Sequence, residues 1–261
     1  MRSLNIAATG MLAQQLNVEV ISNNIANLNT TAFKRQRAEF QDLLYQTQRT
    51  VGASSSDNNT IVPVGVQIGS GVKAAAVYRM SDQGNLISTN NPLDVAIQGL
   101  GYFQIEMPDG TTAYTRDGSF QLSPTGEIVT ADGYVVQPGI TLPSNTTAVT
   151  VNANGQVLAQ IAGQQALQTV GQLQLATFPN EAGLQALGGN YLQETPASGS
   201  PVVGNPGTNA IGTIQQGYLE TSNVNIVTEI TNLITAQRAY EMNSKVIQTS
   251  DDMESTLSQL R

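Results

Sequence analysis

The last stretch of the chain, from about Asn225 to Leu260, carries the clearest periodic pattern in the sequence. Apolar residues recur there at three- and four-residue spacing, and neither Gly nor Pro occurs after Gly217. The pattern predicts one amphipathic helix of about 36 residues, roughly 54 Å long, with Asn225 as its N-cap. Its apolar face has two neighbouring rows, formed by Ile226, Ile230, Leu233, Tyr240 and Ile247 and by Ala239, Met242, Val246, Met253 and Leu260.

The N-terminal residues show a similar pattern, with apolar residues at seven-residue spacing. The first row is Leu4, Met11, Val18 and Ile25, and its companion row is Ala7, Ile21 and Leu28. This spacing predicts a heptad-like helix within residues 1–31 that ends in the turn-favouring stretch Asn27–Thr31. Gly10 is a weak point that costs about 1 kcal/mol relative to Ala. The helix either packs on its own domain or pairs with the C-terminal helix or other subunits.

Residues 32–84 are expected to form an extended linker. After the basic residues Lys34 and Arg35, the segment Phe40–Tyr45 is expected to reverse the chain or continue as a strand. Residues 46–71 form an insertion whose polar, low-complexity part, Gly52–Thr60, is expected to be mobile in a monomer. The run Val62–Ile68 then alternates like an edge strand, because Pro63 disfavours a central position.

From residue 85 to residue 222 the hydrophobic period falls to two, and turn sequences such as Asp117-Gly118 separate short runs. This pattern predicts an antiparallel β-domain, with a helical turn at Asn180–Leu187 and a long surface loop at Thr195–Gly212. The expected strands are Leu93–Ile97, Tyr102–Met107, Thr112–Arg116, Ser119–Leu122, Ile128–Thr130, Tyr134–Gln137, Thr147–Val151, Gln156–Ala159 and Gln172–Phe178.

The predicted class is therefore α+β. Helices in segments 1–31 and 223–261 form a coiled-coil-like pair that brackets the antiparallel all-β domain of residues 85–222. The extended insertion lies between the first helix and the β-domain.

Composition excludes several classes of function. The formal net charge is −8, and neither Lys nor Arg occurs between Arg116 and Arg238, which argues against a nucleic-acid partner. Because the chain has no Cys, His or Trp, disulfides, thiolate or imidazole metal sites and His-based catalysis are excluded. No apolar run approaches the ~18 residues of a membrane span, so no membrane insertion is expected. Polar residues interrupt residues 1–30, so any export is expected to proceed without a cleaved signal peptide.

Five carboxylates are the candidates for chemistry: Asp94, Asp109, Asp117, Glu127 and Asp132. Three of them precede Gly in turns, where the side chain ordinarily caps its own backbone. A glycosidase needs two carboxylates about 5–10 Å apart, and nothing selects such a pair here. We expect no catalytic residue, cofactor or metal. A secreted β-rich protein that binds or cleaves glycans, and a ligand-binding β-domain with helical oligomerisation arms, are the alternatives from other classes.

Three segments resemble motifs of the bacterial flagellar rod and hook proteins. Ser22–Lys34 is similar to their N-terminal motif, Gly99–Phe103 with Tyr114–Phe120 to their β-domain motif, and Ala236–Lys245 to their C-terminal helix. These segments lie at the beginning, middle and end, so the resemblance covers essentially the whole chain. The motif residues are Asn23, Asn24, Asn27, Asn29, Thr30, Phe33, Lys34, Gly101, Phe103, Tyr114, Arg116, Gly118, Phe120, Gln237, Arg238 and Tyr240.

One position departs from the motif. Ala32 stands where many members of the family carry Gly, and we expect it to restrict the backbone there to negative φ.

The resemblance implies a structural subunit rather than an enzyme, most similar to the distal rod subunits of that family. Such a subunit forms a rigid helical homopolymer that transmits motor torque through the periplasm to the hook. Its implied partners are proximal rod proteins, the hook protein, the bushing rings of the peptidoglycan layer and outer membrane, and the flagellar type III export apparatus. Residues 46–71 resemble the distal-rod insertion that packs against neighbouring subunits. A hook or proximal rod subunit is the alternative within the family.

The resemblance also implies that the terminal helices form the inner part of the tube. Their apolar side chains are then expected to be buried against each other and against adjacent subunits. The expected assembly residues are Leu4, Met11, Val18, Ile21, Ile25, Leu28, Ile226, Ile230, Leu233, Tyr240, Met242, Val246, Ile247 and Met253.

Overall fold

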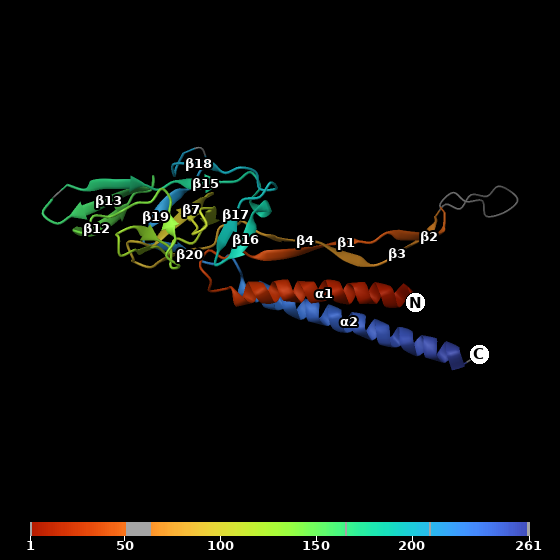
Figure 1. The fold of residues 1–261 in the computed structure, drawn as a ribbon. Helices are drawn as coiled ribbons and strands as arrows, with labels where there is room; N and C mark the ends of the chain where they lie inside the picture. The colour runs from red at the N-terminus through yellow and green to blue at the C-terminus, as the bar shows by residue number, and fades with distance from the viewer. Residues whose placement is uncertain (1, 51–63, 165, 209, 260–261) are drawn as a thin grey trace. The chain divides into compact units, whose positions relative to one another are not determined.

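A computed structural model describes residues 2–50, 64–164, 166–208 and 210–259. Its contacts divide the chain into two compact units, each assembled from segments that are far apart in sequence (Figure 1). The helical unit comprises Met1–Ala26, Gln36–Arg79 and Asn225–Arg261, and the β unit comprises Asn27–Arg35 and Met80–Val224.

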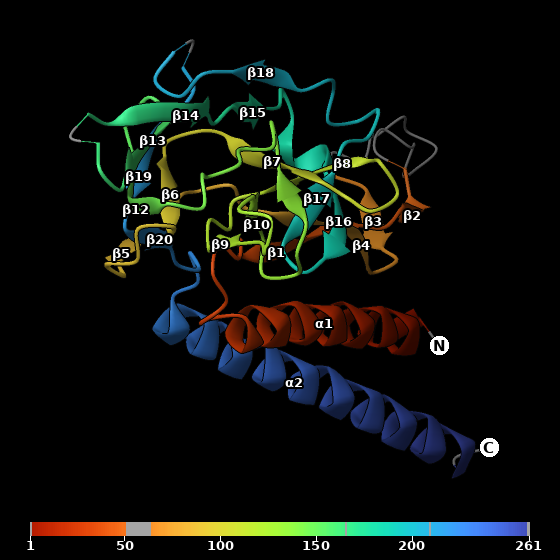
Figure 2. The same cartoon turned by 60° about the vertical axis from the view of Figure 1, so that its left-hand side comes forward.

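The helical unit is built on two long helices, α1 (Arg2–Ala26) and α2 (Ile226–Gln259). They lie side by side in both views (Figures 1 and 2). The side-chain oxygen of Asn225 accepts the backbone N–H groups of Val227 at 3.0 Å and Thr228 at 3.2 Å, as expected of an N-cap. Both predicted helices are confirmed. Within the described residues, neither helix has a stretch long and apolar enough to cross a membrane.

The helical unit also contains a long antiparallel ribbon. Strand β1 (Gln36–Asp42) pairs with β4 (Val72–Arg79), and β2 (Tyr45–Arg49) pairs with β3 (Val66–Gly69). The ribbon runs along α1 on the side away from α2 (Figure 1). A two-stranded ribbon is marginal by itself, so packing on α1 supplies the support that it needs.

The described part of the expected extended linker therefore holds four paired strands. Strand β4 was not predicted, since its Ala74–Ala76 run has low β-propensity and no alternation. Residues 51–63, which include the low-complexity Gly52–Thr60 and the start of the predicted strand Val62–Ile68, lie outside the described residues.

The β unit is the predicted antiparallel domain. Its largest sheet has the strand order β16-β17-β8-β7-β11-β10-β9, and β15 pairs with both β7 and β18. A second sheet has the order β12-β13-β14, and two further pairs are β19 with β6 and β20 with β5. The strand bounds are β5 Leu86–Ser88, β6 Val95–Gln98, β7 Tyr102–Glu106, β8 Thr112–Thr115, β9 Gln121–Leu122, β10 Ile128–Val129, β11 Val135–Val136, β12 Thr146–Val151, β13 Gln156–Ile161, β14 Gln168–Gln172, β15 Leu175–Thr177, β16 Gln185–Gly188, β17 Tyr191–Gln193, β18 Val202–Gly204, β19 Thr213–Gln216 and β20 Tyr218–Glu220.

Strand β7 lies at the centre of the β unit and is covered on both faces. Phe103 and Ile105 point into the main core, where the Phe103 ring meets Phe120 edge-on at 5.0 Å. Tyr102, on the other face, packs with Tyr114 in a smaller cluster. Alternate residues of β7 therefore pack into two different cores, as expected for a strand whose side chains point to opposite faces.

Each expected strand between residues 93 and 178 overlaps an observed strand, with shifted ends. Strands β5, β14 and β16 to β20 were not predicted, and β18 lies inside the expected loop Thr195–Gly212. The expected helical turn is a short 3₁₀ helix, Glu181–Gly183. These missed strands are three to five residues long, too short to show a clear alternation.

The expectation for Ala32 was wrong. Its φ is +57°, in the left-handed region that favours Gly. Ala32 is buried, and its N–H donates to the backbone oxygen of Glu220 at 2.8 Å. This hydrogen bond, together with the turn that Thr30 and Phe33 close, fixes the backbone there despite the steric cost.

Candidate assembly surface and motif cluster

The contact between α1 and α2 is lined by small and polar residues. Ser3 faces Ser250, with 3.3 Å between their hydroxyl oxygens, and Asn24 donates to a carboxylate oxygen of Glu229 at 3.2 Å. Between them, a β-carbon on Gly10 would lie 2.8 Å from the side-chain nitrogen of Asn243. The residue numbers of each facing pair add to 253, so the helices run antiparallel in one continuous register.

We call this contact the polar seam. Its observed pairs are Ser3 with Ser250, Gly10 with Asn243 and Asn24 with Glu229. The same seven-residue spacing assigns Asn17 of α1 and Ala236 of α2 to the polar seam. Gly10, predicted as a weak point in the helix, is a position where the Asn243 side chain of α2 occupies the space that a β-carbon would need. A heptad of small and polar residues has no hydrophobic period, so the apolar pattern did not reveal it. The sequence does show the seven-residue spacing of these small and polar residues, and that spacing could have identified the polar seam.

Asn24 joins three segments of the helical unit at one end of the polar seam. Its side-chain oxygen accepts the backbone N–H of Gln36, and its side-chain nitrogen donates to the backbone oxygen of the same residue, both at 2.8 Å. The same nitrogen reaches Glu229, and both side chains are almost completely buried. Buried amides and carboxylates are retained only where they are hydrogen-bonded, so these contacts fix where β1 and α2 meet α1.

Large apolar side chains lie on the outside of the helix pair. The exposed ones are Ile6 and Leu12 on α1 and Ile226, Val227, Ile230, Ile234, Tyr240, Met242, Val246 and Met253 on α2. Val227 and Met242 are the most exposed of those on α2, at 70% and 69%. Solitary exposed apolar residues are ordinary, but a row along a helix marks an interaction surface.

The expected assembly residues fall into three groups. Ile226, Ile230, Tyr240, Met242, Val246 and Met253 are exposed, whereas Leu4, Met11, Val18, Ile25, Leu28, Leu233 and Ile247 are half-buried. Ile21 is buried. All belong to the helical unit except Leu28, which lies in the β unit just after α1.

A buried charged cluster in the β unit joins the motif residues Lys34 and Arg116. Glu220, at the end of β20, accepts a hydrogen bond from the Lys34 ammonium at 2.6 Å and one from Arg116 Nε at 2.8 Å. The side-chain exposure of Lys34, Arg116 and Glu220 is 9%, 4% and 0% respectively. The motif segments therefore meet at a carboxylate that no sequence pattern had marked.

Backbone groups complete this cluster. Arg116 also donates to the carbonyl oxygens of Gly99 at 2.8 Å and Gly101 at 3.1 Å, and Lys34 donates to that of Asp82 at 2.8 Å. The backbone N–H of Gly84 donates to Glu220 at 2.8 Å. The motif glycines thus place carbonyl groups around the guanidinium, and the buried charges are matched by partners of opposite charge and by hydrogen bonds.

The electrostatics favour an ionised Glu220. Burial raises its pKa, but the positive charges of Arg116 and Lys34 and their hydrogen bonds outweigh this effect and hold the pKa below its usual value. Burial and the neighbouring Arg116 lower the pKa of Lys34, with Glu220 opposing them. A buried cluster of this kind fixes geometry more than it adds stability.

The other motif residues form turns, cores or exposed positions. Asn27 and Thr30 share a side-chain hydrogen bond of 3.1 Å in the turn after α1. A β-carbon on Gly118 would lie 1.7 Å from the Val95 carbonyl oxygen, so only Gly fits. Phe103, Tyr114 and Phe120 are core residues, Phe33 is half-buried, and Asn23, Asn29, Gln237, Arg238 and Tyr240 are exposed.

Comparison with known proteins identifies the family of this chain. Three family models match: "Flagella basal body rod protein" at residues 4–34, "Flagellar hook protein FlgE/F/G D1 domain" at 96–159 and "Flagellar basal body rod FlgEFG protein C-terminal" at 215–260. The chain is 59% identical to the flagellar basal-body rod protein FlgG of Caulobacter vibrioides, over 100% of both chains. The chain belongs to the FlgE/F/G family of flagellar rod and hook proteins.

Other full-length relatives also carry the FlgG name. The FlgG of Agrobacterium fabrum is 56% identical, covering 99% of this chain and 98% of its own, and that of Bacillus subtilis is 38% identical, covering 97% and 96%. The resemblance seen in the sequence is confirmed, as is the prediction of a structural flagellar rod subunit of the basal body. These relatives are rod proteins rather than enzymes, consistent with the expectation of no catalysis.

Three of the five candidate carboxylates of this FlgE/F/G member accept hydrogen bonds from nearby groups. Asp109 accepts hydrogen bonds from Thr111, and Asp117 accepts the backbone N–H of Ser119 at 3.0 Å, so both cap their own turns as predicted. Asp132 instead accepts the hydroxyl of Tyr191 at 2.9 Å. Across the described residues no three acidic side chains gather as a metal site would require.

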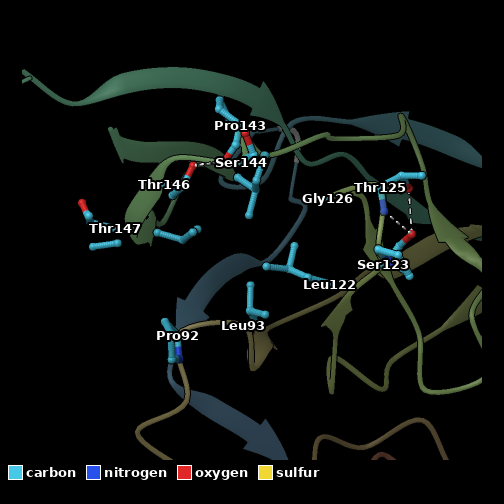
Figure 3. Close-up of a pocket in the computed structure, with 14 residues that line it drawn as sticks. Pro92, Leu93, Leu122, Ser123, Thr125, Gly126, Pro143, Ser144, Thr146 and Thr147 are labelled. Atoms are coloured by element: carbon cyan, nitrogen blue, oxygen red, sulfur yellow. Dashed lines mark hydrogen bonds between the residues drawn. The ribbon is translucent and has the colours of Figure 1, made fainter. Parts of the chain in front are cut away.

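The described part of the β unit has a surface hollow with a volume of about 410 Å³ (Figure 3). Leu93 and Leu122 are among the residues that line it, and Ser123 and Thr125, which also line it, hydrogen-bond to each other. None of its lining residues is charged. A hollow without a carboxylate offers no acid or base for glycan cleavage.

Proposed function

We propose that this rod subunit polymerises through the outward faces of α1 and α2 into the straight helical tube of the distal rod. The observation that carries this proposal is that the residues at the contact between α1 and α2 differ from the large apolar residues that are exposed. The polar seam lies at the contact within the chain, whereas a row of large apolar side chains on α2, with Ile6 and Leu12 on α1, is exposed. Full burial of a Leu, Ile, Val or Met side chain contributes about 1.5–3 kcal/mol, so each subunit gains stability when its neighbours cover these rows.

The distal position is supported by chain length and by the FlgG relatives, which align over the whole chain. In the basal body, the tube would cross the periplasm and transmit torque from the motor to the hook. Its neighbours would be proximal rod proteins at one end and the hook protein at the other. The bushing rings of the peptidoglycan layer and outer membrane would surround it. Export would use the flagellar type III apparatus and retain the N-terminus.

The expected assembly residues keep their proposed role. Those that are exposed, such as Ile230 and Met242, would contact neighbouring subunits, and buried Ile21 would stabilise the subunit itself. Residues 46–71 would pack between subunits and stiffen the tube. Their deletion is expected to lower the bending stiffness of the tube, and an unchanged stiffness would argue against the distal assignment.

The test is electron microscopy of concentrated purified protein. We expect straight tubes from the natural chain and none from a variant that carries both Ile230→Glu and Ile234→Glu, since the charges would have to be buried. The matched control is Ile87→Glu, because Ile87 is 54% exposed on β5 of the β unit. Absence of tubes from the natural chain, or tubes from the double variant, would contradict the proposal.

A further inference from the structure

The outward face of α1 carries little charge. Arg2 and Glu19 are the two charged residues of α1, and both are exposed. Glu19 belongs to a stripe of exposed residues at helical spacing, in which the large apolar member, Leu12, is 66% exposed. Gln15 donates a hydrogen bond to Glu19 at 3.2 Å, so the carboxylate is held along this stripe.

The outward face of α2 has a matching feature of opposite charge. Ile230, Ile234, Arg238 and Met242 follow one another at four-residue spacing and are all exposed. A neighbouring subunit that covers the apolar members of this stripe must also cover the Arg238 guanidinium. Burial of a charge is costly unless it finds a partner of opposite sign.

The register of the polar seam shows which partner fits. Within one chain Glu19 lies at the level of Ile234, because the facing residue numbers add to 253. If α1 of a second copy lies antiparallel on the outward face of α2, a shift of one helical turn places Glu19 opposite Arg238. The same shift places Leu12 at the level of Lys245, next to Val246, and Ala26 at the level of Thr231, next to Ile230. On both sides of the charged pair, an apolar residue of α1 then lies within one residue of the level of an apolar residue of α2.

The next register that pairs Glu19 with a cation is less favourable. Opposing Glu19 to Lys245 would place Leu12 at the level of Asp252, next to Met253, and would leave Arg238, inside the apolar stripe, at the level of Ala26 with no carboxylate opposite it. Glu39, a carboxylate on the ribbon, already has partners within its own chain, since it accepts hydrogen bonds from Arg37 and Tyr78.

Contact between two different faces also propagates from copy to copy, whereas a face that pairs with itself closes as a dimer.

We propose that Glu19 of one subunit pairs with Arg238 of the next and thereby sets the register in which subunits add to the tube. This inference rests on the proposed function, and it names the side chains that select the partner surface. Electrostatic pairs at an interface act mainly on specificity and register.

The test is a charge exchange in the full-length chain, with the critical concentration for tube formation measured by sedimentation. Arg238→Glu alone and Glu19→Arg alone are each expected to raise that concentration about tenfold or more, the equivalent of about 1.4 kcal/mol. The variant with both changes is expected to return close to the natural value. Both residues are exposed in the subunit, so the helical circular dichroism of the monomer is expected to stay unchanged.

The matched control is Lys245→Glu combined with Glu19→Arg, which is expected not to restore assembly. Restored tube assembly in this control, or in the variant with Arg238→Glu and Asp252→Arg, would overturn the proposed pair. Normal tubes from Arg238→Glu alone would overturn it too while leaving the proposed function intact. If the natural chain forms no tubes, the proposed function itself fails.

Discussion

Gly10 of α1 and Asn243 of α2 lie so close that a β-carbon on Gly10 would come within 2.8 Å of the Asn243 side-chain nitrogen. A helix interior normally favours Ala over Gly by about 1 kcal/mol. The presence of Gly in α1 therefore reflects the distance between the helices rather than a weakness of the helix. The polar seam places small or hydrogen-bonding residues at the contact between the two helices, and the exposed apolar residues, such as Met242, are those that the proposed function assigns to contacts between subunits.

Gly10→Leu is expected to force the two helices apart and destabilise the assembled subunit by about 1–3 kcal/mol, a usual cost of overpacking. The measurement is the critical concentration for tube formation, which we expect to rise. Adding Asn243→Ala makes room and is expected to recover part of the loss. Leu12→Ala is the contrasting variant, because Leu12 is 66% exposed and outside the polar seam. Unchanged assembly in Gly10→Leu would mean that this contact does not restrain the helices.

Glu220→Gln is expected to lower the stability of the β unit by about 3–5 kcal/mol, because Lys34 and Arg116 would lose the charge that balances them in a buried site. Thermal or denaturant unfolding of the full chain measures the change. Glu127→Gln serves as the control, since Glu127 is a carboxylate in a turn between β9 and β10 and only partly buried. Equal stabilities of the two variants would remove the structural importance given to the cluster.

The buried cluster of Lys34, Arg116 and Glu220 also predicts that the β unit loses stability in acid. The folded pKa of Glu220 lies below 4.5, the usual value for the unfolded chain, because Arg116 and Lys34 outweigh the effect of burial. A lowered folded pKa contributes stability that is complete above the unfolded value and is lost as pH falls through the folded value. The difference in unfolding free energy between the natural chain and Glu220→Gln should therefore shrink below about pH 4.5. A difference that stays constant down to about pH 3 would contradict the direction of this shift.

The sequence predicted the elements whose stabilisation is local and repeated. Both helices follow from uninterrupted apolar spacing and the Asn225 cap, and strands such as β7 and β8 follow from alternation between clear turns. Strands β18 and β20 are three residues long, and their pairing with distant strands leaves almost no local signal. Ala32 adopts a positive φ because tertiary hydrogen bonds outweigh its intrinsic preference.

The candidate site was predictable only in part. The resemblance marked Lys34 and Arg116, but the carboxylate that joins them, Glu220, ends a short strand about a hundred residues after Arg116 and matches no motif. The sequence also did not show which apolar residues face inward. Hydrophobic spacing shows that α2 has an apolar face, but it does not show that Asn243 and Glu229 of α2 meet Gly10 and Asn24 at the contact with α1.

Tube formation as proposed requires that the outward faces of α1 and α2 become covered only when subunits assemble. Hydrogen exchange of backbone amides, compared between dilute monomer and sedimented tubes, tests this directly. We expect weak protection of residues 4–28 and 226–259 in the monomer and strong protection in the tubes, with the core strand β7 protected in both. Strong protection of both helices already in the dilute monomer would contradict this requirement, because the helices would then be fully stabilised within one chain.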